Sequence, residues 1–484
     1  MAPILPAFLG VGLALAPPPT ILELDVARWS GEHLLGASVD LAVSGGGGAT
    51  LAAAAHAAIA EIRRLDAILS AWRPDSELAL LNEARTMSVS PDLFAAVAMA
   101  ERWRTATAGA FSARLGRLTS GALAGRPAGE EAEALRQAAE AARVDLNPAL
   151  RRITRPDAVR FDLDAVAKGF ILDRALAAAR RGAPEADGLL IDIGGDVRVW
   201  SAERRPAPWV LAVADPDAPF DNAAPLQTLR LRSGALAVSG RSARDRRDGS
   251  AAVSHVLDPR TGQPAPGRMA AVAAPQAAQA DALATALLAA SPDEGRSWVD
   301  SAPGVGALVA AHGGSAFEAG AWNGRPAAAC QGPAAWPKGF ALTASLEIPR
   351  QTAGDYERPY VAAWITDEAR NHVRTLLILG PQARWRESNY IFWRRVERMD
   401  LAAVERVARP TRAPGRYDVV WDGRTESGLS APRGKYVLNI EASREHGGHS
   451  FISIPLNLGA RPFETRAEAA QELGATLVRY GAAR

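Results

Sequence analysis

The stretch FDLDAVAKGFILDRALAAARRGAPEADGLLIDIGGDVRV, residues Phe161–Val199, organises the larger part of this chain. It predicts a short strand, a turn rich in carboxylates, a helix, and a buried strand that ends in a glycine pair. Asp162 and Asp164 stand where side chains cap a helix and complement its dipole. Apolar residues then recur at helical spacing over residues 170–181, and the β-branched run LLIDIGGDV follows them.

Lys168, Gly194 and Gly195 give this stretch a chemical interpretation. A lysine in the first turns of a helix and a glycine pair that permits close approach suit a phosphate-bearing ligand, held together with a metal ion. Taken alone, the same residues also fit a structural explanation, because Asp is a common helix cap and Gly-Gly is a common turn. Motifs further along the chain are needed to decide between the two.

The composition bounds the class of protein. A chain of 484 residues predicts two or three domains, and 48% hydrophobic with 22% charged residues is typical of globular proteins. The net charge of +2, from 55 basic and 53 acidic residues, gives no basis for binding to nucleic acid or to a membrane surface. The single cysteine, Cys330, excludes a disulfide within one chain. The lysines are Lys168, Lys338 and Lys435, so a lysine inside a motif is informative.

The first twenty residues, MAPILPAFLGVGLALAPPPT, resemble a secretory signal peptide, although a positively charged start is missing. An apolar core from Ile4 to Ala16 ends in a small-residue cleavage site, and the core is too short to span a bilayer. We therefore expect export to the periplasm, free or associated with the membrane, and no integral membrane segment. The alternative is an unstructured or wrongly assigned N-terminus.

A polar pair lies on an otherwise apolar helix predicted over Ala277–Ala290. Asp281 and Thr285 are four residues apart, which places a carboxylate and a hydroxyl on one face of that helix. Two hard oxygen donors suit Mg²⁺ or Ca²⁺ better than zinc. The alternative is local, with Asp281 favoured by the helix dipole and Thr285 bonded back to a carbonyl.

Six motifs follow one another along the chain. They are SAWRPDSELALLN (Ser70–Asn82), GAF (Gly109–Phe111), DLDAVAKG (Asp162–Gly169), DIGGDVR (Asp192–Arg198), SHVLDPRTG (Ser254–Gly262) and DALATAL (Asp281–Leu287). In this order and spacing they resemble the FAD:protein FMN transferases of the ApbE family, over residues 21–330. The resemblance implies an α+β domain that transfers the FMN half of FAD, with Mg²⁺, through a phosphoester to a Thr or Ser of an acceptor flavoprotein and releases AMP.

The same resemblance implies the site residues. Mg²⁺ is expected at Asp281, Thr285 and the backbone carbonyl of Ala165. FAD is expected at Leu35, Trp72, Ala110, Phe111, Ser112, Asp162, Lys168, Gly194, Gly195, His255 and Val256, with Lys168 at the phosphates and Trp72 packed on the nucleotide. His255 is the candidate for deprotonating the incoming hydroxyl, because imidazole titrates near neutral pH, and Asp258 is the candidate for orienting it.

The chain departs from the family pattern beside the expected nucleotide pocket. After GAF the family usually reads Asp-Pro-Thr-Val-Gly-Pro, where this chain has Ser112–Arg117. Val238 replaces a usual Thr, Leu35 replaces a frequent Met, and the usual aromatic is absent from RSARDRRD (Arg241–Asp248). Two alternatives to the transferase therefore stay open: a flavin-binding protein with weakened turnover, and a pyrophosphatase that hydrolyses FAD to FMN and AMP.

From Lys338 onward the pattern changes to alternating strands between turn signals. This predicts an antiparallel β-sandwich over residues 338–460, after a linker at 331–337. The string YDVVWDGRTESGLSAPRGKYVLNIEA, residues 417–442, resembles an Ig-like repeat of flagellar hook-capping proteins, and the whole segment resembles an uncharacterised domain of exported bacterial proteins. We expect this domain to recognise or position a partner. Residues 461–484 are expected to form a helical tail, with the helix over Arg466–Tyr480.

An aromatic connection rich in Arg lies between the predicted strands of this second domain. It contains Trp385, Tyr390, Phe392 and Trp393. The pattern fits either a helix that caps the core or an interaction surface, because aromatic residues and Arg are enriched in binding hot spots.

Overall fold

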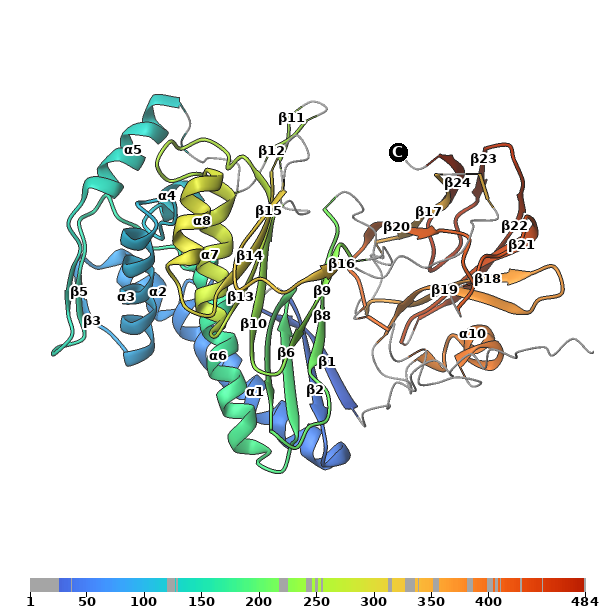
Figure 1. Cartoon of the computed structure of the whole chain (residues 1–484), viewed down its shortest axis with the longest axis horizontal. Coiled ribbons are helices and arrows are strands. Elements are labelled where there is room, and N and C mark those ends of the chain that lie inside the picture. The colour runs from blue at the N-terminus through green and yellow to red at the C-terminus, as the bar shows by residue number, and fades with distance from the viewer. Residues whose placement is uncertain are drawn as a thin grey trace, which may run out of the picture.

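Two folded parts follow one another along the chain, a mixed α+β part and a β-sandwich (Figure 1). The computed structural model describes residues 26–35, 37–119, 127, 129–216, 225–240, 246–248, 251–253, 256–311, 316–326, 336–337, 339–350, 357–380, 386–397, 404, 408–409, 411–426, 429–445 and 447–482. The α+β part begins with the first described strand, and Trp336 is the first residue in the core of the sandwich. The predicted fold class, a transferase-like α+β domain followed by an antiparallel β-sandwich, is confirmed.

An eight-stranded sheet forms the centre of the α+β part, and all neighbouring strands in it are antiparallel. In spatial order the strands are β1 (Val26–Leu34), β2 (Ala37–Ser44), β6 (Gly188–Ile193), β7 (Asp196–Ser201), β10 (Gly234–Gly240), β13 (Gly267–Ala274), β14 (Gly306–Ala311) and β15 (Ala316–Gly320). The glycine pair predicted to end a buried strand is the two-residue turn between β6 and β7. Both glycines have positive φ, 61° and 96°, which a glycine adopts without strain.

Three helices cover one face of this sheet: α1 (Gly47–Leu69), α6 (Asp164–Gly182) and α7 (Ala277–Ala289) (Figure 1). Their apolar faces share one core with inward side chains of the strands, such as Leu41 and Ile191. The other face is covered by a small sheet of β8 (Trp209–Val213), β9 (Gln227–Leu231) and β16 (Arg325–Pro326). The apolar faces of the helices and one face of the sheet therefore form one core, and the other face of the sheet forms a second core with the small sheet.

The remaining described elements of this part are five further helices and five short strands. The helices are α2 (Glu77–Glu83), α3 (Pro91–Ala106), α4 (Gly116–Thr119), α5 (Gly129–Ala141) and α8 (Pro292–Asp300). The short strands are β3 (Thr86–Ser88), β4 (Asp145–Asn147), β5 (Arg152–Thr154), β11 (Arg246–Asp248) and β12 (Ala251–Val253). Ser76 and Ser90 cap α2 and α3 with their hydroxyls.

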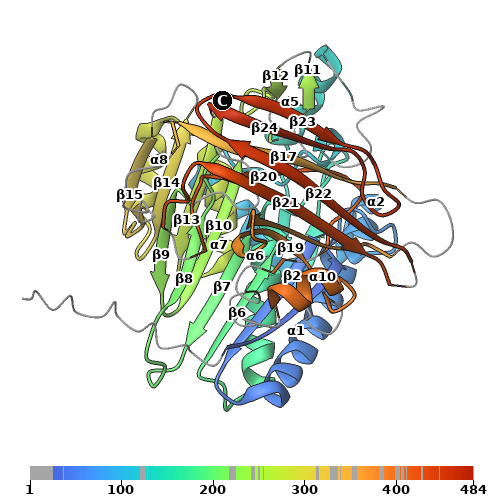
Figure 2. The same cartoon turned by 90° about the vertical axis from the view of Figure 1, so that its right-hand side faces the viewer.

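The C-terminal part consists of two four-stranded antiparallel sheets packed around one apolar core (Figure 2). One sheet contains β20 (Gly415–Trp421), β17 (Phe340–Ile348), β24 (Thr476–Ala482) and β23 (Phe463–Ala467). The other contains β19 (His372–Leu379), β18 (Tyr360–Asp367), β21 (Gly434–Ser443) and β22 (His449–Leu458). Helix α10 (Tyr390–Arg395) packs on the outer face of the second sheet, where Phe392 is fully buried against Trp364.

The predicted helical tail is wrong. Residues 463–467 and 476–482 form β23 and β24, and β24 lies between β17 and β23 in the first sheet. Pairing on both sides of β24 satisfies its backbone groups and buries Val478 and Tyr480, so tertiary context overrides the helical pattern. In the aromatic connection, Phe392 lies in the core, as expected for a helix that caps it, and the half-exposed Tyr390 stacks on His449. The alternative, an interaction surface, stays a prediction. Trp385 lies outside the described residues.

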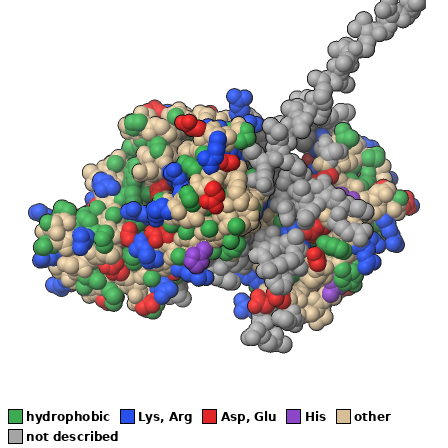
Figure 3. Space-filling model, turned by 90° about the horizontal axis from the view of Figure 1, so that it is seen from below, with side chains coloured by type: hydrophobic (Ala, Val, Ile, Leu, Met, Phe, Trp, Pro, Cys, Tyr) green, Lys and Arg blue, Asp and Glu red, His purple; other side chains and the backbone are tan. Residues whose placement is uncertain are grey.

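The surface agrees with the near-neutral composition. On the face shown in Figure 3, acidic and basic side chains lie interspersed. Among the described residues, no helix combines the length and the apolar character needed to cross a bilayer.

Candidate functional site

The site forms where the first turns of α6 meet α7. The backbone N–H of Gly169 on α6 donates to a carboxylate oxygen of Asp281 on α7, at 3.0 Å. A regular helix would aim this N–H at the carbonyl of Ala165, four residues earlier. The helices approach closely here because position 169 has no side chain, and a Cβ added there would lie 2.3 Å from the Ala277 carbonyl oxygen. Gly169 therefore permits the contact that joins the two predicted motifs.

Asp281 is a carboxylate in an apolar helix. It is 3% exposed, and burial together with the charge of Asp196 raises the pKa of the Asp281 carboxyl to about 7, while Lys168 acts in the opposite direction. One turn further along α7, the Thr285 hydroxyl lies 3.3 Å from the hydroxyl of Ser239 at the end of β10. Two oxygen groups of α7 thus lie on the face predicted from their spacing, and a cation beside Asp281 would stabilise its charged form.

The donors expected for a metal fit a hard divalent cation. They are one carboxylate, one hydroxyl and one backbone carbonyl, from Asp281, Thr285 and Ala165. Among the described residues, no cluster of three or more His, Cys, Asp or Glu side chains could hold a metal ion. A set with so little charge suits Mg²⁺, which commonly keeps several waters and binds one or two carboxylates plus substrate phosphates.

Lys168 is held by a second carboxylate that the sequence did not single out. Its ammonium group pairs with Asp196, which directly follows the glycine pair and is buried. The other Asp196 oxygen accepts a hydrogen bond from the backbone N–H of Val238, at 3.1 Å. This arrangement joins α6, β7 and β10 and fixes the direction of the lysine at the expected phosphate position.

The turn of Gly194 and Gly195 lies beside the same charges. Asp192 accepts a hydrogen bond from the Gly195 N–H at 2.8 Å, and burial raises the pKa of the Asp192 carboxyl to about 7. Asp40 is its direct cross-strand neighbour on β2 and raises this pKa further. A Cβ added at Gly195 would meet no atom within 4 Å, so this side of the turn is open to an approaching group.

Asp162 and Trp72 border the start of α6. One Asp162 oxygen accepts from the N–H of Asp164 at 3.1 Å, and the other accepts from the Thr119 hydroxyl at 2.6 Å. The N-cap residue of α6 is Leu163, so Asp162 and Asp164 flank the cap position. The Trp72 side chain is 63% exposed, and its indole N–H donates to Asp164 at 3.0 Å. An exposed indole held in this way offers a flat apolar face next to the helix start, as the predicted packing on a nucleotide requires.

The GAF residues form the wall behind this region. Ala110 and Phe111 are buried in the main core, so their side chains support the segment and its backbone is the part left for a ligand. Ser112 donates its hydroxyl to Glu140 on α5. Leu35 has a positive φ of 56° at the β1–β2 turn and packs against the same core.

The expected His–Asp pair is described only in part, because His255 lies outside the described residues. Both oxygens of Asp258 accept from the guanidinium of Arg260, at 3.0 Å each, and Asp258 is 6% exposed. Arg260 also reaches the Ala289 carbonyl at the end of α7, at 2.6 Å. Asp258 therefore organises the turn after His255, and its carboxylate is engaged by Arg260. Val256 follows His255 and accepts the N–H of Ala265 at 2.8 Å.

Sequence reasoning missed four groups at the site: Asp192, Asp196, Ser239 and Thr119. Each contacts a predicted site residue or borders it from an element distant in sequence. Asp192 and Asp196 stand inside the motif DIGGDVR, and the flanking of a glycine pair by two carboxylates was an available signal. The contacts of Ser239 and Thr119 depend on the folded sheet and have no local signature.

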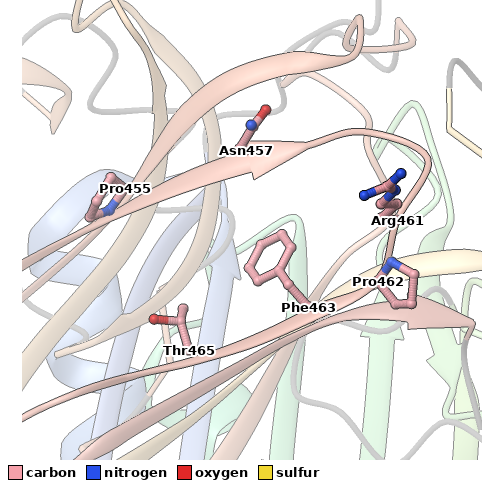
Figure 4. A pocket seen from close by; sticks show the side chains of 6 residues that line it. All are labelled: Pro455, Asn457, Arg461, Pro462, Phe463 and Thr465. Carbon is pink, nitrogen blue, oxygen red and sulfur yellow. The ribbon is translucent and has the colours of Figure 1, made fainter.

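A hollow of about 380 Å³ lies elsewhere, on the β-sandwich. It is lined by Pro455, Asn457, Arg461, Pro462, Phe463 and Thr465 (Figure 4). These residues come from β22, β23 and the connection between them, and none of them is a carboxylate. The hollow therefore belongs to the second domain and contributes nothing to the polar site on α6 and α7.

Comparisons with known proteins agree with both parts of the chain. Residues 35–309 match the ApbE family, and residues 341–475 match the family described as "Predicted periplasmic protein (DUF2271)". The FAD:protein FMN transferase of Treponema pallidum is 30% identical over 289 residues, covering 53% of this chain and 78% of that protein. The FAD:protein FMN transferase of Haemophilus influenzae is 26% identical over 251 residues, covering 48% and 71%. The crystal structure of the ApbE protein from Thermotoga maritima superposes with a TM-score of 0.54 and 26% identity, covering 61% of this chain and 97% of that one.

Proposed function

The chain belongs to the ApbE family, and from this membership we propose that it is a FAD:protein FMN transferase. The reaction breaks the bond between the phosphorus of the FMN half and the bridging oxygen of the FAD pyrophosphate. A new bond forms between that phosphorus and a Thr or Ser oxygen of an acceptor protein, and AMP leaves with the bridging oxygen. The relatives in Treponema pallidum and Haemophilus influenzae, both named for this activity, support the proposal.

The contact between Gly169 and Asp281 is the observation on which the site assignment depends. It joins the Asp281 carboxylate to the early turns of α6, which contain Ala165 and Lys168, and Thr285 follows Asp281 by one turn of α7. We assign these three oxygens to Mg²⁺. When bound, the ion supplies charge stabilisation to the pyrophosphate as it breaks, and the protein supplies position and direction.

The chain's own side chains have separate tasks in this proposal. Lys168, held by Asp196, faces the phosphates as a fixed cation, and the exposed Trp72 indole, held by Asp164, packs on the nucleotide. His255 accepts the proton of the incoming hydroxyl. Because Arg260 binds both oxygens of Asp258, we assign that carboxylate to shaping the loop that contains His255.

The acceptor and the location follow from the second domain and the leader. The match of residues 341–475 to predicted periplasmic proteins supports export to the periplasm, where the acceptor would be an exported flavoprotein with a reactive Thr or Ser. The resemblance of residues 1–20 to a signal peptide agrees with this location. We assign the β-sandwich to positioning that acceptor.

The test measures two products in one reaction. The purified chain is incubated with FAD, Mg²⁺ and an exported flavoprotein that contains a candidate Thr, and we record AMP release and in-gel flavin fluorescence of the acceptor. Asp281→Ala should abolish both signals, because it removes the one carboxylate among the assigned Mg²⁺ ligands. Asp293→Ala is the matched control, since Asp293 is fully exposed on the neighbouring helix α8.

The outcomes separate the three functions considered. AMP together with a fluorescent acceptor supports the transferase. AMP that appears at the same rate without any acceptor protein indicates a pyrophosphatase. Bound FAD without AMP indicates a flavin-binding protein. Full turnover by Asp281→Ala would contradict the metal assignment.

A further inference from the structure

Helix α7 contains both predicted metal-binding side chains but provides no cap for its own N-terminus. The N-cap residue Gln276 makes no side-chain hydrogen bond to the helix, and the first turn has no acidic residue. The first N–H groups of a helix have no partner within the helix and need one from elsewhere. Something outside α7 must therefore hold the end that precedes Asp281.

Asp173 of α6 supplies this cap from a neighbouring helix. One carboxylate oxygen accepts the N–H of Ala277 and the other accepts the N–H of Ala278, both at 3.0 Å. Arg198 on β7 donates to the same carboxylate at 2.8 Å and also to the Gly234 carbonyl at 2.7 Å. Both oxygens of Asp173 are thus engaged, and the residue is tied to the central sheet.

Helices α6 and α7 are antiparallel and are joined by two sets of hydrogen bonds: that of Asp173 with the first turn of α7, called the Asp173 rung, and that of Gly169 with Asp281, called the Asp281 rung. On α6, Asp173 follows Gly169 by four residues, or about one turn. On α7, Ala277 precedes Asp281 by the same spacing. Asp173 binds the first turn of α7, and Gly169 binds Asp281 one turn later. A change at the Asp173 rung therefore moves or loosens α7 at the Asp281 rung.

We propose that Asp173 is a positioning residue that sets the register of α7 against α6 and thereby places the Asp281 carboxylate and the Thr285 hydroxyl for the cation. This inference rests on the proposed function for its consequence in catalysis, and on the hydrogen bonds above for its structural part. Asp173 itself touches no reacting atom.

The test compares Asp173→Asn with the removal of a cap from another helix. Asn keeps the size of Asp173 but presents an NH₂ group, which donates, to one of the two N–H groups. Ser90→Ala is the control, because the Ser90 hydroxyl caps a different helix, α3, by accepting the Leu93 N–H at 3.2 Å. Arg198→Gln is a milder second variant, which keeps the Asp173 carboxylate and removes its ion pair.

Three measurements are made on the full chain: hydrogen exchange of the α7 amides without ligand, Mn²⁺ binding by electron paramagnetic resonance, and the Mg²⁺ dependence of AMP release. For Asp173→Asn we expect faster exchange in the first turn of α7 and about tenfold weaker binding of both ions, which is about 1.4 kcal/mol. The rate at saturating Mg²⁺ should fall much less. Arg198→Gln should weaken ion binding about threefold, a fraction of that effect. Ser90→Ala should change none of these quantities.

The outcomes distinguish this inference from the proposed function. Wild-type exchange in α7 and ion binding within twofold of wild type for Asp173→Asn would overturn the positioning role. Equal weakening by Ser90→Ala would also overturn it, because general loss of stability would then explain the effect. If the wild-type chain releases no AMP, the proposed function fails, and exchange with Mn²⁺ binding still decides the role of Asp173. If Asp173→Asn does not fold, Arg198→Gln decides it by the same criteria.

Discussion

Replacing Gly169 with Ala tests the close approach of α6 and α7 on which the site depends. The added Cβ would lie 2.3 Å from the Ala277 carbonyl oxygen, 2.5 Å from the Ala277 carbonyl carbon and 2.7 Å from the Ala278 Cα. All three atoms belong to the backbone, so no side-chain rotation relieves the overlap. Restoring an ordinary contact of about 3.5 Å requires the helices to separate by about 1 Å.

The expected cost follows from that separation. Overpacking of a close-packed interior costs about 1–3 kcal/mol. Ala is a better helix former than Gly by about 1 kcal/mol, which offsets part of this cost. We therefore expect Gly169→Ala to lower the free energy of unfolding by up to about 2 kcal/mol. The larger effect should be on activity, because a displacement of about 1 Å at a positioned group can reduce the rate about 100-fold.

The assay is urea unfolding of the full chain together with AMP release at a series of Mg²⁺ concentrations. Gly48→Ala on α1 is the matched control, because a Cβ added there would meet no atom within 4 Å. It should leave both quantities at or above wild type. Wild-type stability and AMP release for Gly169→Ala would refute the reasoning, since α6 and α7 would then accept a methyl group between their backbones.

Two further predictions concern buried charges. Asp192 has a folded-state pKa of about 7 against an ordinary 3.8, so the folded chain binds the extra proton between these values and its stability falls as the pH rises from about 4 to 7. Asp192→Asn should remove this loss and have a free energy of unfolding about 2 kcal/mol higher than wild type at pH 8. The full pKa shift would give about 4 kcal/mol, and the partial exposure of Asp192 reduces that figure. If the free energies of unfolding of the two proteins change in parallel from pH 4 to pH 8, this prediction is contradicted. In the β-sandwich, Arg386 and Glu397 form an ion pair at 2.7 Å with side chains 2% and 0% exposed. Arg386→Met should lower the free energy of unfolding by about 3–5 kcal/mol, because it removes the ion-pair partner of a fully buried carboxylate. Arg479→Met, in an exposed pair, should lower it by less than about 1 kcal/mol, and equal losses in urea unfolding would show that burial does not govern these pairs.

Local sequence signals predicted the long elements of the fold well. Helix α7 lies within one residue of its predicted range, and helix α6 contains the apolar run predicted over residues 170–181, because apolar residues recur at helical spacing there. The strands of the sandwich were predicted from alternation bounded by turns. Helix α8 and strands β14 and β15 were not predicted, although Ser291 and Glu294 form a capping box at the start of α8.

The C-terminal error shows where local reasoning fails. Val478 and Tyr480 are buried while Arg479 between them is exposed, so the last strand alternates with the period of two that a strand requires. That signal spans only seven residues, and it follows directly on a polar stretch that has no period of two. The deciding fact was pairing with β17, more than 130 residues earlier, which a local pattern does not contain.

At the candidate site, too, local patterns predict some residues, and contacts between distant elements determine the others. The pair Asp281 and Thr285 follows from helical spacing, and Lys168 from its place near a helix start. The partners that fix them, Asp196 and Asp173, come from contacts across elements. A carboxylate that caps a neighbouring helix, as Asp173 does, looks in the sequence like any polar residue on a helix surface.

The departures from the family pattern keep the scaffold of the pocket. Val238 replaces a usual Thr, yet it holds Asp196 through its backbone N–H at 3.1 Å, a contact that any non-proline residue can make. Arg114, in the altered stretch after GAF, is 5% exposed, and it donates to Glu101 at 2.9 Å and to the Ala142 carbonyl at 2.7 Å. It therefore fastens α5 to α3 behind the GAF segment. At both positions, hydrogen bonds of the substituted residue support the elements around the pocket, and Asp281 and its neighbours stay in place. This favours retained flavin transfer over a protein that only binds flavin.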